Sequence, residues 1–120
     1  MEERTYEQVA LIGAGVIGSG WATRCLAKGL SVVLTDPSPD ARSQVKKTIE
    51  GAWPVLEDSG LVSQGDPTNF RFVETIQEAV EGADFIQENV PEREDLKIEV
   101  HETIDRYAAE NVVIASSSSG

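Results

Sequence analysis

Short apolar runs alternate with longer amphipathic stretches along this chain, and the alternation predicts its secondary structure. The apolar runs are rich in β-branched residues and have the length of buried strands; they span residues 9–12, 31–35, 70–73, 84–90 and 112–115. The intervening stretches carry apolar residues at helical spacing and predict helices over 16–28, 41–56, 75–80 and 92–108. Gly29, Gly60 and Gly82 follow three of these helices, where glycine commonly ends a helix.

This alternation of strands and helices predicts an α/β fold. Each helix joins two strands that run in the same direction. We therefore expect a doubly wound, mostly parallel Rossmann sheet with helices on both faces and right-handed crossovers. The length of 120 residues fits one domain of this kind. Ligands of such sheets bind at the carboxyl ends of the strands, near the point where the strand order reverses.

A glycine-rich hexapeptide joins the first predicted strand to the first predicted helix. It reads Gly13-Ala14-Gly15-Val16-Ile17-Gly18. In a dinucleotide-binding unit the first glycine permits a tight turn, the second lets the backbone approach the pyrophosphate, and the third lets the helix pack closely on the strand. The free N–H groups and the positive dipole end of the helix then hold the phosphates. We therefore predict that these six residues bind a dinucleotide.

Asp36 is the predicted partner of this loop. It ends the second strand, eighteen positions after Gly18, where a separation of about 20 residues is typical. A carboxylate there accepts hydrogen bonds from the adenosine ribose and repels the 2′-phosphate of NADP, so NAD is the expected cofactor. FAD, which uses a similar fingerprint, is the lesser alternative. The structural alternative is that the glycines form only a turn and that Asp36 only caps one. The coincidence of strand, loop, helix and acidic residue argues against this alternative.

The net charge and the cysteine content restrict which partners, metal sites and cellular compartments are expected. Ten Lys and Arg against 21 Asp and Glu give a formal net charge of −11, which repels nucleic acid and anionic membranes. No apolar run is long enough to cross a bilayer, and the polar N-terminus does not resemble a secretion signal. Cys25 is the only cysteine, so no internal disulfide or cysteine metal cluster can form. We expect a cytoplasmic protein without a metal site.

Several segments carry a family resemblance. Leu11–Trp21 resembles the opening of the 3-hydroxyacyl-CoA dehydrogenase family, and Phe85–Arg93 with Asp95–Lys97 resembles its branch that acts on small hydroxy acids. Gly51–Pro54 and Ile114–Gly120 fit the same family. The resemblance implies oxidation of a secondary alcohol while NAD takes the hydride, with the 3-hydroxyl of L-carnitine as the expected target. L-Gulonate and 3-hydroxyacyl-CoA are the alternative substrates, and a non-catalytic dinucleotide-binding module is the alternative of another class.

The resemblance also implies roles for individual residues. By position, Glu92 and Lys97 lie beside the nicotinamide half of NAD, and Ser119 hydrogen-bonds the reacting oxygen of the substrate. From the residues alone, Glu92 equally complements the dipole of its helix, Lys97 is typical of an exposed helical lysine, and Ser119 fits a polar loop. His101, the only histidine, does not match the family's catalytic position, and we interpret it as a surface or helix-packing residue.

Finally, the resemblance implies parts that this sequence lacks. In the family, the catalytic base is a histidine that follows the next strand, and a helical C-terminal domain completes the substrate pocket and the dimer. We therefore expect residues 1–120 to be the NAD-binding portion of a larger homodimeric enzyme. A general base must lie within hydrogen-bond reach of the proton it takes, so this portion alone should bind NAD without turning over substrate.

Overall fold

Strands and helices alternate in the computed structural model, which describes residues 7–60, 65–89, 94–108 and 112–116. The strands are β1 (Gln8–Ile12), β2 (Ser31–Thr35), β3 (Phe70–Phe72), β4 (Phe85–Glu88) and β5 (Val113–Ser116). The helices are α1 (Gly15–Ala27), α2 (Ala41–Asp58), α3 (Ile76–Val80) and α4 (Glu94–Tyr107). Each predicted element is present, and its ends lie within two residues of the prediction where the structure describes them.

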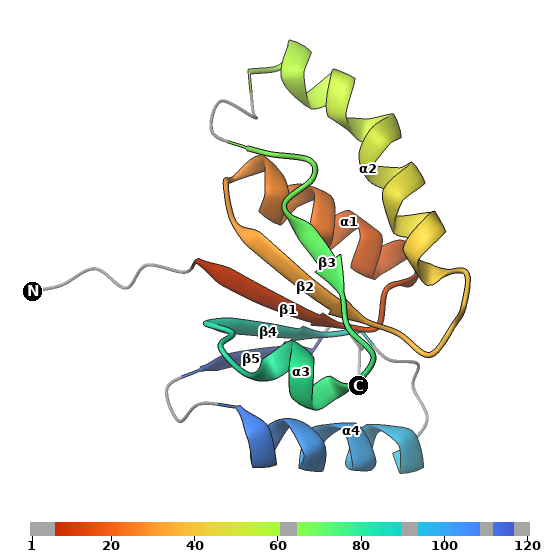
Figure 1. Ribbon diagram of the computed structural model, residues 1–120, viewed down its shortest axis with the longest axis vertical. Helices are drawn as coiled ribbons and strands as arrows, with labels where there is room; N and C mark the ends of the chain where they lie inside the picture. Colours follow the sequence, from red (N-terminus) through yellow and green to blue (C-terminus); the bar gives the residue numbers. More distant parts are fainter. Residues whose placement is uncertain (1–6, 61–64, 90–93, 109–111, 117–120) are drawn as a thin grey trace, which may run out of the picture.

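The strands form one parallel sheet in the order β3-β2-β1-β4-β5. From β1, the chain adds β2 and then β3 on one side. It then crosses back to place β4, and after it β5, on the other side of β1 (Figure 1). Val9 in β1 is in register with Val32 in β2 and with Phe85 in β4. The order is that of a Rossmann sheet, which confirms the predicted fold, and the reversal lies between β1 and β4.

Helices cover both faces of the sheet. Because successive strand residues point to opposite faces, Val9 and Leu11 join a core with α1 and α2, while Ala10 and Ile12 join a second core on the other face. The second core includes Val100 and Ile104 of α4 and the buried residues of α3. Figure 1 shows the same division, with α1 and α2 on one side of the strands and α3 and α4 on the other.

A glycine turn connects α1 directly to β2. Gly29 has a φ of 86°, a left-handed conformation that favours glycine. Its N–H donates to the Leu26 carbonyl at 3.0 Å, and the N–H of Leu30 donates to the Cys25 carbonyl, also at 3.0 Å. These two bonds form a Schellman motif, which satisfies the last carbonyls of the helix. The predicted helix stop at Gly29 is therefore confirmed.

The second helix packs through one stripe of residues. Its buried residues recur every fourth position, at Ala41, Val45, Ile49 and Trp53. Pro54 lies inside α2 and removes one helical N–H donor, yet the helix continues to Asp58. Burial of Trp53, which is only 9% exposed, contributes to holding the last turns in the core that α2 shares with α1.

Candidate dinucleotide-binding site

A cleft of about 570 Å³ opens at the carboxyl ends of β1, β2 and β4. The described residues that line it come from these strand ends, the glycine loop, the start of α3, and α4: Ile12, Gly13, Ala14, Gly15, Thr35, Asp36, Pro37, Glu74, Ile76, Asn89 and Val100. The cleft therefore lies at the reversal of strand order, where ligands of open α/β sheets bind. The glycine loop and Asp36, predicted to act together, line the same cleft.

Backbone geometry explains the three glycines of the loop. Gly13 and Gly15 have φ values of 95° and 46°, which residues with a side chain rarely adopt. Gly18 lies in the first turns of α1, and a Cβ built on it would fall 2.4 Å from the Gly13 carbonyl oxygen. A Cβ built on Gly15 would meet no atom within 4 Å, so this position leaves open space for a ligand. Gly13 thus forms the expected turn and Gly18 the expected close packing of helix on loop; the expected approach of a pyrophosphate at Gly15 stays a prediction.

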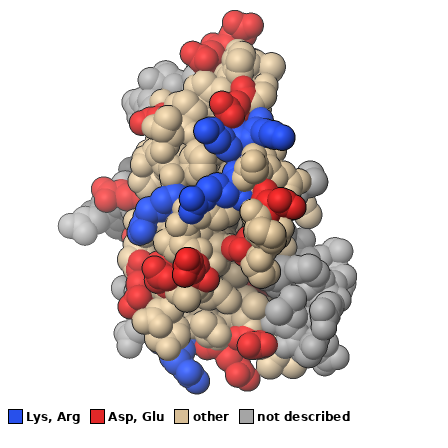
Figure 2. Space-filling model, turned by 45° about the vertical axis from the view of Figure 1, so that its right-hand side comes forward, with Lys and Arg blue, Asp and Glu red and all other residues tan. Residues whose placement is uncertain are grey.

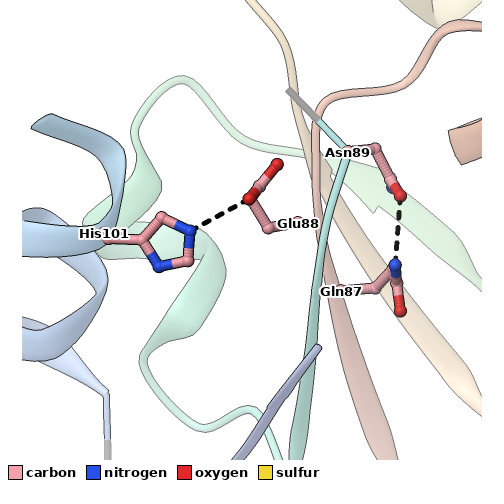
Figure 3. Close-up of polar contacts among 4 residues, drawn as sticks. All are labelled: Gln87, Glu88, Asn89 and His101. Atoms are coloured by element: carbon pink, nitrogen blue, oxygen red, sulfur yellow. Dashed lines mark hydrogen bonds and ion pairs between the residues drawn. The ribbon is translucent and has the colours of Figure 1, made fainter. Parts of the chain in front are cut away.

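Asn89 anchors the glycine loop, a role that the sequence analysis missed. Its backbone N–H donates to the Ile12 carbonyl at 2.8 Å, and its side-chain Nδ2 donates to the Gly13 carbonyl at 3.2 Å. The Gln87 side chain donates to Asn89 Oδ1 at 3.3 Å, on the side of β4 opposite Glu88 (Figure 3). The Gly13 N–H donates to the Thr35 carbonyl at 2.9 Å. The loop is thus held by both strands that flank β1.

The carboxylate of Asp36 also takes part in building the loop. Oδ2 accepts the backbone N–H of Ala14 at 2.7 Å, and Oδ1 accepts that of Ser38 at 2.8 Å. Each carboxylate oxygen has a second acceptor position, so two hydrogen bonds remain possible. Asp36 is half-buried and lines the cleft. It can therefore accept ribose hydroxyls while it fixes the loop.

A phosphate group in this cleft would meet backbone dipoles rather than basic side chains. None of the described residues that line the cleft is Lys or Arg, and two of them, Asp36 and Glu74, are acidic. Ala14 occupies the N-cap of α1, where no side chain caps the helix, so first-turn N–H groups remain available to an anion. Figure 2 shows Lys and Arg gathered in a band between patches of Asp and Glu on the face in view. Arg42, Lys46 and Arg71 line a separate groove beside α2 and β3.

Some predicted site residues lie beyond what the structure describes. Glu92 and Ser119 fall outside the described residues, and the structure places the backbone but not the side chains of Val16 and Lys97. Ile17 is 57% exposed at the start of α1. Within the described part of the chain, no cluster of His, Cys, Asp and Glu could hold a metal ion, and no helix is long and apolar enough to cross a membrane.

His101 contacts Glu88, which the sequence analysis did not foresee. The His101 side chain is 42% exposed, and its Nε2 lies 3.0 Å from Oε1 of Glu88, a side chain with no exposed surface (Figure 3). Neither residue is among those that line the cleft. Thirteen positions separate them in sequence, and no local pattern couples a strand end to the third turn of the following helix.

Comparison with known proteins identifies the family. The family model described as "3-hydroxyacyl-CoA dehydrogenase, NAD binding domain" matches residues 8–120, nearly the whole chain. The chain belongs to the 3-hydroxyacyl-CoA dehydrogenase family. Its cofactor is NAD, as the loop and Asp36 predict, and the alternative of FAD is set aside. The cleft fits this cofactor, because Gly18 leaves no room for a Cβ where the loop meets the helix and Gly15 leaves the approach to the amides open.

Individual relatives are similar over most of this chain. L-carnitine dehydrogenase of Burkholderia mallei is 53% identical over 111 residues, which are 92% of this chain and 35% of that protein. The chain thus spans about a third of the length of the curated relatives that it matches. The solved structure of FHMPC 5-dehydrogenase, an NAD-dependent dismutase, is 38% identical with a TM-score of 0.83, covering 97% of this chain and 38% of that one. A (S)-3-hydroxybutyryl-CoA dehydrogenase of Ralstonia eutropha is 28% identical with a TM-score of 0.80, covering 96% and 42%.

Proposed function

We propose that this domain binds NAD for an enzyme that oxidises the 3-hydroxyl of L-carnitine to the ketone 3-dehydrocarnitine. The observation that carries the proposal is the 53% identity with an L-carnitine dehydrogenase over 92% of this chain. When bound, NAD accepts the hydride that leaves the carbinol carbon. The chain's own residues bind and orient this cofactor, and the catalytic base and most of the substrate pocket belong to the longer protein.

The proposed cofactor contacts follow from the cleft. The amides at the start of α1, in the loop Gly13–Gly18, bind the pyrophosphate, and Asp36 accepts the adenosine ribose hydroxyls. Glu92 and Lys97 are proposed to lie beside the nicotinamide half, and Ser119 to hydrogen-bond the reacting oxygen of the substrate. The position of β4 and β5 supports this, because these residues follow the carboxyl ends of the two strands.

The proposal extends to the whole protein. We place residues 1–120 at the N-terminal side of a chain about three times as long, which the relatives' length supports. The full-length protein is proposed to be a cytoplasmic homodimer in which a second domain completes the substrate site. Sedimentation of the full-length protein at micromolar concentration tests the dimer, and a monomer would contradict it.

The deciding experiment measures NADH formation by the full-length protein. L-Carnitine, L-gulonate and a 3-hydroxyacyl-CoA are compared at equal concentration, and we expect the highest kcat/KM with L-carnitine. A higher kcat/KM for the acyl-CoA would assign the protein to the activity named for the Ralstonia eutropha relative. NADH binding without turnover of any of the three would instead favour a dinucleotide-binding module.

Cofactor choice is tested separately by calorimetry. We expect NAD to bind more tightly than NADP, because a 2′-phosphate would lie against the Asp36 carboxylate. Asp36→Ala should lower NAD affinity and narrow the difference between the two cofactors. Glu57→Gln, an exposed change in α2, is the matched control for loss of one negative charge. Equal affinities of the wild-type chain for NAD and NADP would refute this role of Asp36.

A further inference from the structure

A buried glutamine interrupts the apolar face of β4. Gln87 is only 3% exposed, and it lies in register with Leu11 of β1, which belongs to the core shared with α1. A buried carboxamide is costly unless it is hydrogen-bonded. Side chains two positions apart along a strand project to the same face, so Gln87 can reach Asn89. Its Nε2 donates to Oδ1 of Asn89 at 3.3 Å (Figure 3).

This hydrogen bond fixes which way the Asn89 carboxamide faces. A carboxamide has one oxygen that accepts and one NH2 group that donates. The Gly13 carbonyl only accepts, so Asn89 presents Nδ2 to it, at 3.2 Å. Oδ1 of Asn89 then faces Gln87, whose NH2 group donates to it. If the Asn89 amide turned over, two oxygens would meet at Gly13 and two NH2 groups would meet at Gln87. Gln87 thus selects the orientation in which Asn89 donates to the loop.

Asn89 and Asp36 hold the two ends of a single peptide unit. The carbonyl of Gly13 and the N–H of Ala14 belong to the same planar unit. The carbonyl accepts from Asn89 at 3.2 Å, and the N–H donates to Oδ2 of Asp36 at 2.7 Å. Gly13 has a φ of 95°, and the conformational freedom of glycine would otherwise let this unit rotate. Two side chains, one after β4 and one after β2, therefore fix the direction in which the loop enters α1.

We propose that Gln87 is a positioning residue for the dinucleotide: it orients the Asn89 carboxamide, which holds the loop so that its amides face the pyrophosphate. This inference rests on the phosphate contacts of the proposed function. Gln87 is not among the described residues that line the cleft, and it lines a separate groove of about 440 Å³ beside α1. Its effect on the cofactor therefore passes through Asn89, which does line the cleft. Without Gln87 the Asn89 amide can turn, fewer molecules hold the loop in place, and the apparent affinity falls with that fraction.

The test compares dissociation constants for NADH, measured by titration of the full-length protein. Gln87→Met keeps an unbranched side chain of similar length but removes the donor, and Asn89→Ala removes the amide that Gln87 orients. We expect Kd to rise about fivefold in Gln87→Met, which only releases the amide, and about tenfold in Asn89→Ala, which removes its bond to the loop. The double variant should match Asn89→Ala within about twofold. Gln44→Met, the same replacement at an exposed position in α2, is the control and should leave Kd unchanged.

The double variant separates action through Asn89 from an independent effect of packing. If Gln87 acted by packing alone, the two losses of affinity would multiply to about fiftyfold, and the inference would be wrong. A Gln87→Met protein with a lower thermal midpoint but the Kd of wild type would also overturn it. Should Gln87→Met not fold, Gln87→Leu supplies the same comparison, because leucine suits a buried position. NADH binding without oxidation of L-carnitine would contradict the proposed function alone, since every comparison here measures binding rather than turnover.

Discussion

Replacement of Gly18 by alanine tests the glycine loop most directly. A Cβ at this position would lie 2.4 Å from the Gly13 carbonyl oxygen and 3.2 Å from its carbonyl carbon. Ordinary van der Waals contact begins near 3.4 Å, so the loop and the helix must separate by about 1 Å. The obstructing atom is backbone, and it is held by Asn89 on one side and, through Gly13 N–H, by Thr35 on the other. The clash cannot be relieved by a side-chain rotation.

The expected cost follows from these contacts. Overpacking of this kind costs about 1–3 kcal/mol, and loss of the Asn89 hydrogen bond costs about 1 kcal/mol more. Alanine in a helix gains about 0.5–1 kcal/mol over glycine, which offsets part of that loss. Gly18→Ala should therefore lower the free energy of unfolding by about 1–3 kcal/mol. Because the amides of the loop move with Gly13, affinity for NADH should fall at least about tenfold.

Gly20→Ala is the matched control. It lies in the same helix, and a Cβ built there meets no atom within 4 Å, so only the gain in helix propensity remains. Urea unfolding followed by the fluorescence of Trp21 and Trp53 gives the stability of both variants, and titration with NADH gives the affinities. The reasoning would be refuted if Gly18→Ala matched Gly20→Ala in stability and bound NADH as tightly as wild type.

Three further predictions concern the loop, the thiol and turnover. Gly15→Ala should cost about 1–2 kcal/mol of stability, because the φ of 46° is unfavourable for alanine. It should also reduce NADH affinity, because the added Cβ would occupy the open space that the loop offers to a ligand. Unchanged NADH affinity in titration would contradict this prediction. Burial raises the pKa of the Cys25 thiol, although Lys28 acts in the opposite direction, so less thiolate is present at pH 8. Iodoacetamide should therefore alkylate Cys25 more slowly than free cysteine, and urea unfolding should remove the difference. The isolated 120-residue chain should bind NADH yet not oxidise L-carnitine, and a normal rate would disprove the placement of the base outside it.

Local patterns were sufficient to predict the strands and helices. Val32, Val33 and Leu34 form a buried apolar run, and β2 has the predicted bounds of Ser31–Thr35. In α2, the apolar residues at every fourth position predict a helix, whereas Pro54 argues against one. The helix continues through Pro54, as the apolar pattern predicts. The turn and helix start at the glycine loop were predictable for the same reason, since they depend on a short contiguous stretch between a strand and a helix.

Contacts between distant segments were not predictable. Asn89 donates to Gly13 across 76 positions, and Glu88 pairs with His101 across 13. An asparagine that follows a strand fits any polar turn, and a glutamate within an apolar run gives no sign of its partner. These contacts depend on strand order, which brings the end of β4 beside the loop that follows β1. Strand order is a property of the assembled sheet, and no local stretch of the sequence indicates it.

In a domain with this net charge, the proposed phosphate site has to rely on backbone N–H groups. With a net charge of −11 and no Lys or Arg among the described residues of the cleft, long-range attraction cannot draw in a dinucleotide. Oriented amides act only at short range, so binding requires the loop to be rigid before the ligand arrives. Asp36 supplies part of that rigidity through Ala14 and Ser38. In the proposed complex, its charge would also repel a 2′-phosphate. The carboxylate that the proposed function assigns to cofactor selection also builds the loop, so a change of specificity to NADP needs a replacement for its two backbone hydrogen bonds as well as for its charge.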